Sequence, residues 1–444
     1  MIIPTEKLVR YAAIVLLPAG IASAMRPDLL YAFTAVAGIG SLIIFADAAF
    51  VFRFPTLIRV DLPGKVRLTR NVQGFIDIVV SDKRPKGGEI TLALSLPPSI
   101  STERPSVQVR TPGTNNIVKV SWPATAFNRG LYPVKRISVR IPSPLGLWQR
   151  QAVIPCESEI AVYPNLFKER RHLAAHFLNR TGAGSHVQRP IGKGREFEKL
   201  RDYVRGDSPT DIHWKASAKR GELVTKEFMI ERTQEIYVVV DASRLSGRLD
   251  SAEPGNDPVL EKFITSALIL GMVAQRQGDR YGLLTFDSTI LRFLRAGGGS
   301  AHFRSCRDTL YDLQPAPVSP NFSELASFIN MNLRKRSLIF LLTSLDDQAM
   351  AESFERDLSL VNRRHLVIVN ILKPPHANPV FTGEPVTNTA EIYEHLAGHL
   401  VLNDLEELKI RLRHKGMDLY LMGKGSLSTR MVSQYMEVKR RQLL

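Results

Sequence analysis

Carboxylate, imidazole and basic side chains lie close together between Arg201 and Lys219. Asp207, Asp211 and His213 have the side-chain types that general acid–base catalysis uses. Such catalysis also needs a nucleophile or a substrate pocket, and the neighbouring sequence indicates neither. The sequence also contains no nucleophile elbow, Walker loop, HExxH motif or Rossmann fingerprint. We therefore expect that the protein is not an enzyme.

The same stretch alternates charged with aromatic residues, a pattern typical of a surface that contacts a partner protein. An ordinary solvated helical face held in place by one tryptophan would show the same spacing. Both interpretations stay open at this stage. The residues that we assign to partner binding, called the signature surface below, are Arg201, Arg205, Asp207, His213, Trp214 and Lys215.

A short helix is expected to hold part of this surface. Ser208 and Pro209 are typical of a helix start, because a serine hydroxyl accepts from free backbone amides and proline suits the first helical position. Arg220 and Gly221 are typical of its end, since a cation favours the negative end of the helix dipole and glycine adopts the left-handed conformation. Apolar spacing over residues 197–204 favours a helix there as well.

Several positions in a fixed order give this stretch a specific resemblance. These positions are Phe197, Leu200, Arg201, Tyr203, Gly206, Asp207, Ile212, His213, Trp214, Lys215, Ala218 and Leu223. They resemble the signature of the bacterial and archaeal family called domain of unknown function 58. Members of that family are similar to partners of MoxR-type AAA+ ATPases and carry a von Willebrand factor A-like domain after the signature. The resemblance implies the same fold and the same class of partner here.

The resemblance also implies a divalent cation site at one edge of the α/β sheet. In von Willebrand factor A-like folds an Asp-x-Ser-x-Ser loop, a threonine and a later aspartate supply the hard oxygen ligands that Mg²⁺ prefers. Asp241 and Ser243 match the start of that loop, but Leu245 occupies the place of its second serine. Ser300, which follows three glycines, is the candidate replacement for the threonine.

The last ligand position is altered too. Ser344 stands where the aspartate is expected, and Asp346 and Asp347 come only afterwards. The site therefore lacks one charge and one hydroxyl, and Mg²⁺ gives up its water reluctantly without carboxylates. We expect Asp241 and its two serine partners to form a degraded site that binds Mg²⁺ weakly or not at all. No other cofactor is indicated.

The 444-residue chain is long enough for two or three domains. Its net charge of +16 favours an anionic partner, and inner-leaflet lipid and nucleic acid are the general candidates. No nucleic-acid reading motif carries the basic residues, so we expect membrane lipid and no nucleic acid as a partner. Cys156 and Cys306 lie far apart and indicate neither a zinc site nor a disulfide framework.

Residues 1–55 are expected to form a transmembrane hairpin. Two apolar runs, 9–25 and 29–52, flank a short polar turn, and the second exceeds the ~20 residues needed to span a bilayer. A signal-peptidase-like sequence at 22–24 leaves a cleaved leader as the alternative for the first run. Basic residues after the second run place the bulk of the chain on the cytoplasmic side of the inner membrane. Asp47 is expected to pair with a neighbouring helix or to reach the membrane interface.

Four further segments follow this hairpin. Residues 56–165 alternate short β-rich runs with turns, which predicts an all-β, sandwich-like domain. Residues 166–196 are a basic connector that we expect to be mobile, and residues 197–230 are the signature segment. In residues 231–444 strands and helices alternate, which predicts a doubly wound α/β sheet. The family resemblance identifies this last segment as the von Willebrand factor A-like domain.

A membrane-anchored cytoplasmic adaptor is the leading hypothesis for the whole chain. The family resemblance implies that it links a MoxR-type ATPase to an unidentified client protein, in chaperone-like assembly or envelope maintenance. A metal-dependent adhesion or sensing module that works without the ATPase is the alternative. The gene neighbourhood discriminates between them, because an adjacent gene for such an ATPase supports the adaptor.

Overall fold

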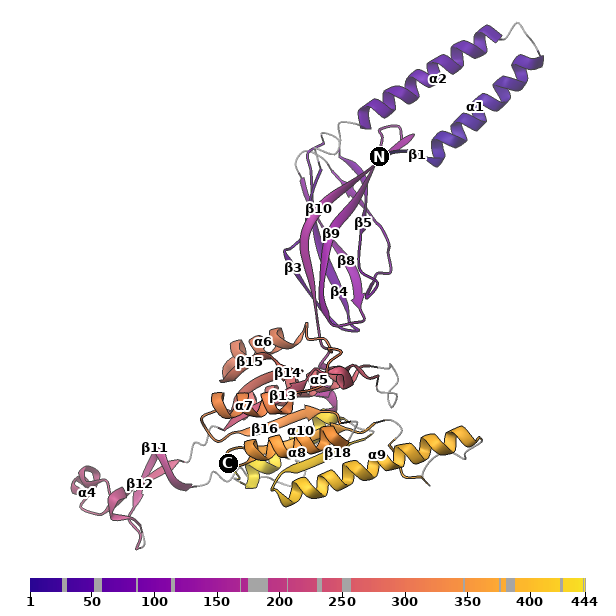
Figure 1. Ribbon diagram of the computed structural model, residues 1–444. Helices are drawn as coiled ribbons and strands as arrows, with labels where there is room; N and C mark the ends of the chain where they lie inside the picture. The colour runs from indigo at the N-terminus through magenta and orange to yellow at the C-terminus, as the bar shows by residue number, and fades with distance from the viewer. Residues whose placement is uncertain are drawn as a thin grey trace. The chain divides into compact units, whose positions relative to one another are not determined.

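The computed structural model divides the chain into two compact units, Met1–Asn165 and Leu166–Leu444 (Figure 1). Each unit is described by itself. The described residues are 1–25, 30–51, 58–84, 87–112, 116–167, 169–174, 191–205, 207–229, 234–249, 257–345, 348–374, 377–380, 388–423, 426–441 and 443.

Two helices, α1 (Glu6–Met25) and α2 (Leu30–Val51), lie side by side in the first unit (Figure 1). They coincide with the two apolar runs of the sequence. Among the described residues no helix is long and apolar enough to cross a membrane, so the predicted transmembrane hairpin over residues 1–55 is not supported. In α1 the charged side chains within residues 6–10 leave an apolar remainder shorter than the ~20 residues that a spanning helix needs.

Two β-sheets share one core in the rest of the first unit, as the alternating sequence predicted. One sheet has the order β1-β10-β9-β5-β7, with β3 beside β10, and the other has the order β2-β4-β8-β6. Inward-facing side chains such as Ile78, Trp122 and Ile137 are fully buried between them. The strands are β1 (Ile2–Pro4), β2 (Ile58–Asp61), β3 (Lys65–Thr69), β4 (Gln73–Asp82), β5 (Gly88–Leu94), β6 (Ile100–Ser101), β7 (Val107–Thr111), β8 (Asn116–Ala126), β9 (Gly130–Pro142) and β10 (Trp148–Tyr163).

Asp47 joins α2 to the β-strands of the same unit. Its buried carboxylate accepts hydrogen bonds from Ser143 Oγ and from the backbone amide of Leu145, the latter at 3.1 Å. Close by, Trp148 Nε1 donates to the carbonyl oxygen of Ile44 at 3.0 Å. We expected Asp47 to pair with a neighbouring helix or to reach the membrane interface, whereas its observed partners lie in the loop between β9 and β10.

A six-stranded sheet forms the centre of the second unit, with the order β15-β14-β13-β16-β17-β18. All neighbouring strands are parallel except β15, which is antiparallel to β14. Helices α5, α6 and α10 cover one face and α7, α8 and α9 cover the other, so Val238 and Val239 of β13 lie in different cores. The elements are β13 (Glu235–Asp241), α5 (Val259–Arg276), β14 (Arg280–Phe286), β15 (Ile290–Gly297), α6 (Gly299–Leu310), α7 (Phe322–Asn332), β16 (Leu338–Thr343), α8 (Gln348–Asn362), β17 (Leu366–Leu372), α9 (Thr389–His414), β18 (Asp418–Met422) and α10 (Leu427–Arg441).

The predicted basic connector is partly structured. Residues 169–174 are helical, and Leu173 is buried in the core that α5 and α10 share. Residues 191–196 already belong to β11 (Ile191–Asp202), and residues 175–190 lie outside the described part of the chain. Residues 169–174 are therefore not the mobile strap that we expected, because an apolar side chain packed in a core fixes the backbone that carries it.

Candidate functional site

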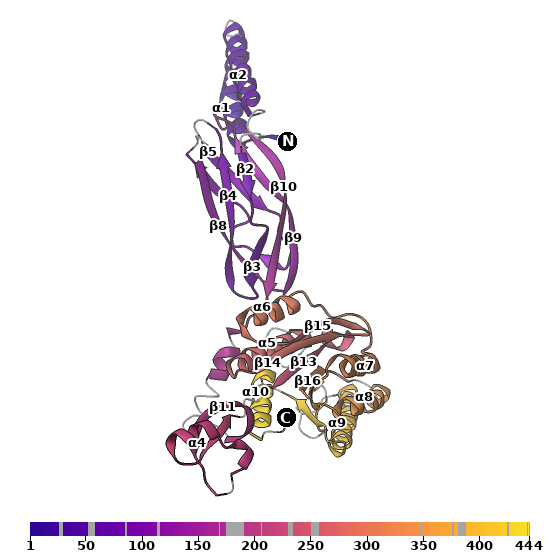
Figure 2. The same ribbon diagram turned by 90° about the vertical axis from the view of Figure 1, so that its left-hand side faces the viewer.

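The signature segment forms a two-stranded hairpin with a short helix in its loop (Figure 2). β11 pairs antiparallel with β12 (Val224–Met229), so that Arg201 lies opposite Thr225. The prediction of a helix over residues 197–204 is therefore wrong. Helical spacing over so short a run is outweighed here, because pairing with β12 satisfies the backbone amides and carbonyls of β11.

The helix in the loop begins later than predicted. Ser208 makes no capping hydrogen bond, and Pro209–Asp211 forms only a single 3₁₀ turn, η3. Ile212 then has an extended backbone, since it bridges to Thr225 of β12, and its side chain is buried. An extended residue cannot continue a helix, so the Ser-Pro-Thr-Asp start signal yields one turn and no more.

The helix α4 (Trp214–Arg220) starts directly after His213. The Nδ1 atom of His213 accepts a hydrogen bond from a backbone amide of the first turn at 3.1 Å, so the imidazole caps the helix. The helix ends before Gly221, whose φ of +75° is the left-handed conformation that we predicted for it. Ser217 Oγ accepts from the amide of Val224 at 2.9 Å, which ties α4 to β12.

Arg201 and Asp207 form a clamp across the turn that leads to η3. The two guanidinium nitrogens Nη1 and Nη2 of Arg201 donate to the two carboxylate oxygens of Asp207 at 2.8 and 2.7 Å. The amide of Val204 donates to the same carboxylate at 3.0 Å. Arg201, followed by this amide, lowers the pKa of Asp207 below its usual range. Asp207 therefore serves the fold of the hairpin and has little capacity left for a partner.

Three apolar side chains lie exposed where the hairpin and α4 meet. Trp214 is 66% exposed, Val204 is 60% exposed and Leu223 is 46% exposed. Backbone amides at 203 and 213 donate to the carbonyls of 223 and 224 at 2.9 and 2.8 Å, which gathers the three residues at one junction. Trp214 is thus no core residue and does not hold this helical face in place by burial.

Two basic residues of the signature surface face solvent. Arg205 and Lys215 are exposed, as are Lys219 and Arg220 in the last turn of α4. The six predicted residues therefore divide by role. One pair clamps the turn and His213 caps the helix, whereas Arg205, Trp214 and Lys215 remain available to a partner.

The predicted cation loop lies at the point where the strand order of the sheet reverses. Asp241 ends β13 and is 1% exposed. One of its carboxylate oxygens accepts from the amide of Ser243 at 2.8 Å, and the other accepts from the hydroxyl of Thr343 at 2.5 Å. Burial raises the pKa of Asp241, and the nearby carboxylate of Asp287 raises it further.

The rest of the loop does not restore the missing ligands. Leu245 is buried, and Ser246 Oγ donates to the carbonyl oxygen of Ser243 at 2.7 Å. Ser344 is buried directly after β16, while the aspartates at 346 and 347 lie outside the described residues. The hydroxyl of Ser246 is therefore engaged within its own turn.

Ser300 lies at the opposite end of the sheet from Asp241. Asp241 is paired with Phe286 at the end of β14, whereas Gly297 is paired with Tyr281 at its beginning, because β15 runs antiparallel. Five residues of strand at ~3.3 Å each separate the two ends, or about 17 Å. Ser300 follows Gly297 in the first turn of α6. The structure brings Asp241 and Ser243 together but does not bring Ser300 to them.

Sequence reasoning missed Asp287 and Thr343 near Asp241. The buried strand β14 ends at Phe286, so the aspartate directly after this apolar run was the available signal. Asp287, however, accepts from the amide of Thr289 at 2.9 Å, and both oxygens of Asp241 are already engaged. In the described ranges, no group of three or more His, Cys, Asp or Glu residues is placed to hold a metal ion. The residues present do not fit the predicted Mg²⁺ site.

Two sequence comparisons bear on this arrangement. The family described as "Protein of unknown function DUF58" matches residues 199–392. The "Uncharacterized protein YeaD" of Bacillus subtilis (strain 168) is 27% identical over 124 residues, which are 28% of this chain and 30% of that protein. The chain therefore matches less than a third of the length of this relative.

Solved structures with similar folds are distant in sequence. The conserved hypothetical protein BatB from Bacteroides thetaiotaomicron is 14% identical, with 47% of this chain and 99% of that chain covered and a TM-score of 0.29. An aerotolerance-related membrane protein from Bacteroides fragilis NCTC 9343 is 13% identical, with 46% and 98% covered and a TM-score of 0.29. The SpRpn10 VWA domain is 9% identical, with 46% and 95% covered and a TM-score of 0.28. Scores this low carry no functional argument.

The matched range begins in β11, includes the signature hairpin, and continues through the central strands to the start of α9. The sheet itself has the doubly wound order, with one antiparallel edge strand, that the resemblance required. Residues 199–392 are thus a DUF58 domain, and the α/β domain of this chain is von Willebrand factor A-like.

Proposed function

We propose that this chain is a non-catalytic interaction module whose signature surface binds a MoxR-type AAA+ ATPase. The observation that carries the proposal is the exposure of Trp214, together with that of Val204 and Leu223 on the backbone segments that meet there. A large aromatic side chain in water contributes little to folding, whereas tryptophan and arginine are the side chains most often found as anchors of protein interfaces.

The charge around this junction specifies the partner surface further. Lys215 follows the tryptophan in α4, Arg205 follows Val204, and Lys219 adds a third exposed cation on α4. An acidic partner surface with an apolar centre would complement this arrangement, because interface charges steer encounter while the buried centre supplies affinity. The clamp and the helix cap hold the surface in one conformation before binding, which reduces the entropy lost on association.

The wider role follows from this contact. The chain works as an adaptor through which the ATPase acts on a client protein, in chaperone-like assembly or envelope maintenance. It does so at the cytoplasmic face of the inner membrane. The net charge of +16 supports this location, since anionic lipids attract basic surfaces by about 1 kcal/mol per nearby Lys or Arg.

A pull-down with the MoxR-type ATPase encoded in the same genome tests the proposal. Trp214→Ala should weaken binding about 30-fold, because truncation of an anchor costs ~2 kcal/mol or more. Arg205→Ala and Lys215→Ala should weaken it less, and all three should keep the melting temperature of the wild type. The matched control is Tyr393→Ala on α9, an aromatic residue that is 68% exposed.

The comparison with the cation loop decides between the two surfaces. Asp241→Ala should weaken binding less than Trp214→Ala does. If Asp241→Ala abolishes binding while Trp214→Ala binds like the wild type, the signature surface is not the docking site. Equal losses for Trp214→Ala and Tyr393→Ala would show that the pull-down reports general surface hydrophobicity instead of a specific contact.

A further inference from the structure

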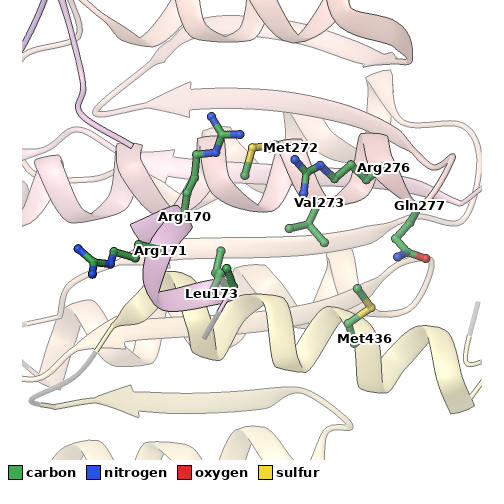
Figure 3. A pocket seen from close by; sticks show the side chains of 9 residues that line it. Arg170, Arg171, Leu173, Met272, Val273, Arg276, Gln277 and Met436 are labelled. Atoms are coloured by element: carbon green, nitrogen blue, oxygen red, sulfur yellow. The ribbon is translucent and has the colours of Figure 1, made fainter. Parts of the chain in front are cut away.

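A pocket of about 540 Å³ lies between the helical segment 169–174, the end of α5 and α10 (Figure 3). Its floor consists of apolar side chains. Leu173 is buried in the core, and Met272, Val273 and Met436 are partly buried around it. Flexible methionine side chains adapt to ligands of different shape. A volume between about 300 and 1,000 Å³ is typical of small-molecule sites.

Three arginines are among the residues that line this pocket. Arg170, Arg171 and Arg276 are exposed, and within the described residues none of them forms an ion pair. In Figure 3 the guanidinium groups of Arg170 and Arg276 lie on the same side of the pocket as Met272, whereas Arg171 points away. The guanidinium groups of Arg170 and Arg276 therefore lie beside the apolar floor of the pocket.

Acidic side chains on the neighbouring elements are engaged elsewhere. Glu169 accepts from Ser426, Asp279 pairs with Lys439 at 2.8 Å, and Glu437 pairs with Arg441 at 2.5 Å. The carboxyl end of α5 contributes about half a negative charge, which is small beside the unit charges of two or three arginines. The pocket is therefore electropositive at its rim and apolar at its floor.

We propose that this pocket binds a small anionic amphiphile, with a carboxylate or phosphate head and an apolar tail. The head is held by Arg170 and Arg276, because guanidinium groups bind such oxygens through paired charge-assisted hydrogen bonds. The tail lies against Val273 and the two methionines. The site is separate from the signature surface and does not depend on the ATPase.

Methionine methyl resonances provide a direct test, because Met272 and Met436 line the pocket and Met331 on α7 does not. The full-length chain, freed of detergent and labelled at its methionine methyl groups, is titrated with sodium decanoate. The signals of Met272 and Met436 should shift together and saturate, while that of Met331 stays in place. Met272→Leu and Met436→Leu assign the two signals.

Matched ligands separate the two parts of the proposal. Decyl phosphate should shift the same two signals, and its affinity relative to decanoate shows which head is preferred. Decanol has the tail without the charge, and sodium phosphate has the charge without the tail. Binding of either one as tight as that of decanoate would overturn the proposal, and so would shifts spread over all methionines.

Matched variants locate the head. Arg276→Gln should weaken decanoate binding about tenfold, since it removes one charge-assisted pair. Arg440→Gln, at an exposed arginine of α10 that does not line the pocket, should leave the affinity unchanged. If the two variants bind decanoate equally, the attraction is a general effect of net charge and the pocket is not the site.

Discussion

Replacing Asp47 by alanine should release α2 from the β-sandwich without unfolding the sandwich. The buried carboxylate accepts hydrogen bonds from Ser143 Oγ and the Leu145 amide, so the substitution leaves two donors without their acceptor. Each hydrogen bond to a charged group contributes about 1.5–3 kcal/mol. Because water reaches the opened loop, we take the lower value for each bond and expect local opening to become easier by about 3 kcal/mol.

Hydrogen exchange at the loop between β9 and β10 measures this change. About 3 kcal/mol corresponds to roughly 100-fold faster exchange of the Leu145 amide, if exchange there proceeds by local opening. Amides of β4 and β9 should keep their protection, because their core residues Ile78 and Ile137 belong to a cluster without side chains from α2. Asp47→Asn should have a smaller effect, since its amide oxygen still accepts one bond.

The matched control is Asp61→Ala in β2, where the carboxylate is exposed and pairs only with the exposed Arg59 among the described contacts. It should leave exchange at Leu145 unchanged, because exposed pairs contribute little. Wild-type exchange at Leu145 in Asp47→Ala would refute the reasoning. Equal acceleration in the strands of the sandwich would also refute it, because α2 would then be part of the sandwich core.

Three further predictions concern stability and location. Millimolar Mg²⁺ should raise the melting temperature very little, since Leu245 and Ser300 supply no ligand beside Asp241 and a ligand at its dissociation constant adds only ~0.4 kcal/mol; a shift of many degrees would contradict this. Burial lowers the pKa of His365, so the stability that its neutral imidazole contributes should be fully present above the unfolded pKa of about 6.5 and be lost as the pH falls through the lower folded pKa; denaturant titrations at several pH values should show a weaker pH dependence of the unfolding free energy for His365→Phe than for the wild type, and an equal dependence would contradict this. A fluorescent protein fused after Leu444 should fluoresce and alkaline phosphatase fused there should be inactive, and active phosphatase would contradict the cytoplasmic location.

The strands of the α/β sheet could be predicted because each is a short run of buried residues. Glu235–Asp241 is such a run, and its end placed Asp241 and Ser243 correctly. The prediction that Ser300 lies near Asp241 was wrong. It rested on the glycines that precede Ser300 and did not consider that the chain reverses direction between β14 and β15. The turn between β14 and β15 is too short for a parallel crossover, so β15 runs antiparallel to β14 and ends beside the beginning of β14, away from Asp241. The sequence therefore did contain the signal for the position of Ser300, namely the short length of the turn between β14 and β15.

The start of α4 could not be predicted from local signals. Ser208 and Pro209 form a strong start signal, yet Ile212 is extended because it bridges to Thr225 thirteen residues away. A long-range backbone pair therefore overrides the local preference, and His213 takes over as the cap. The same long-range pairing places residues 197–202 in the strand β11.

The exposure of Trp214 is also a consequence of contacts between α4 and the rest of the signature hairpin. A helix as short as α4 would not be stable by itself, because nucleation is costly and few hydrogen bonds repay it. It persists since His213 caps it, Ser217 binds the amide of Val224, and the clamp of Arg201 on Asp207 holds the preceding turn. These contacts engage backbone amides and the carboxylate of Asp207, and they leave the indole of Trp214 exposed to solvent. The hairpin thus orders the exposed Trp214 and, next to it in α4, the exposed Lys215, which is the arrangement that the proposed binding surface requires.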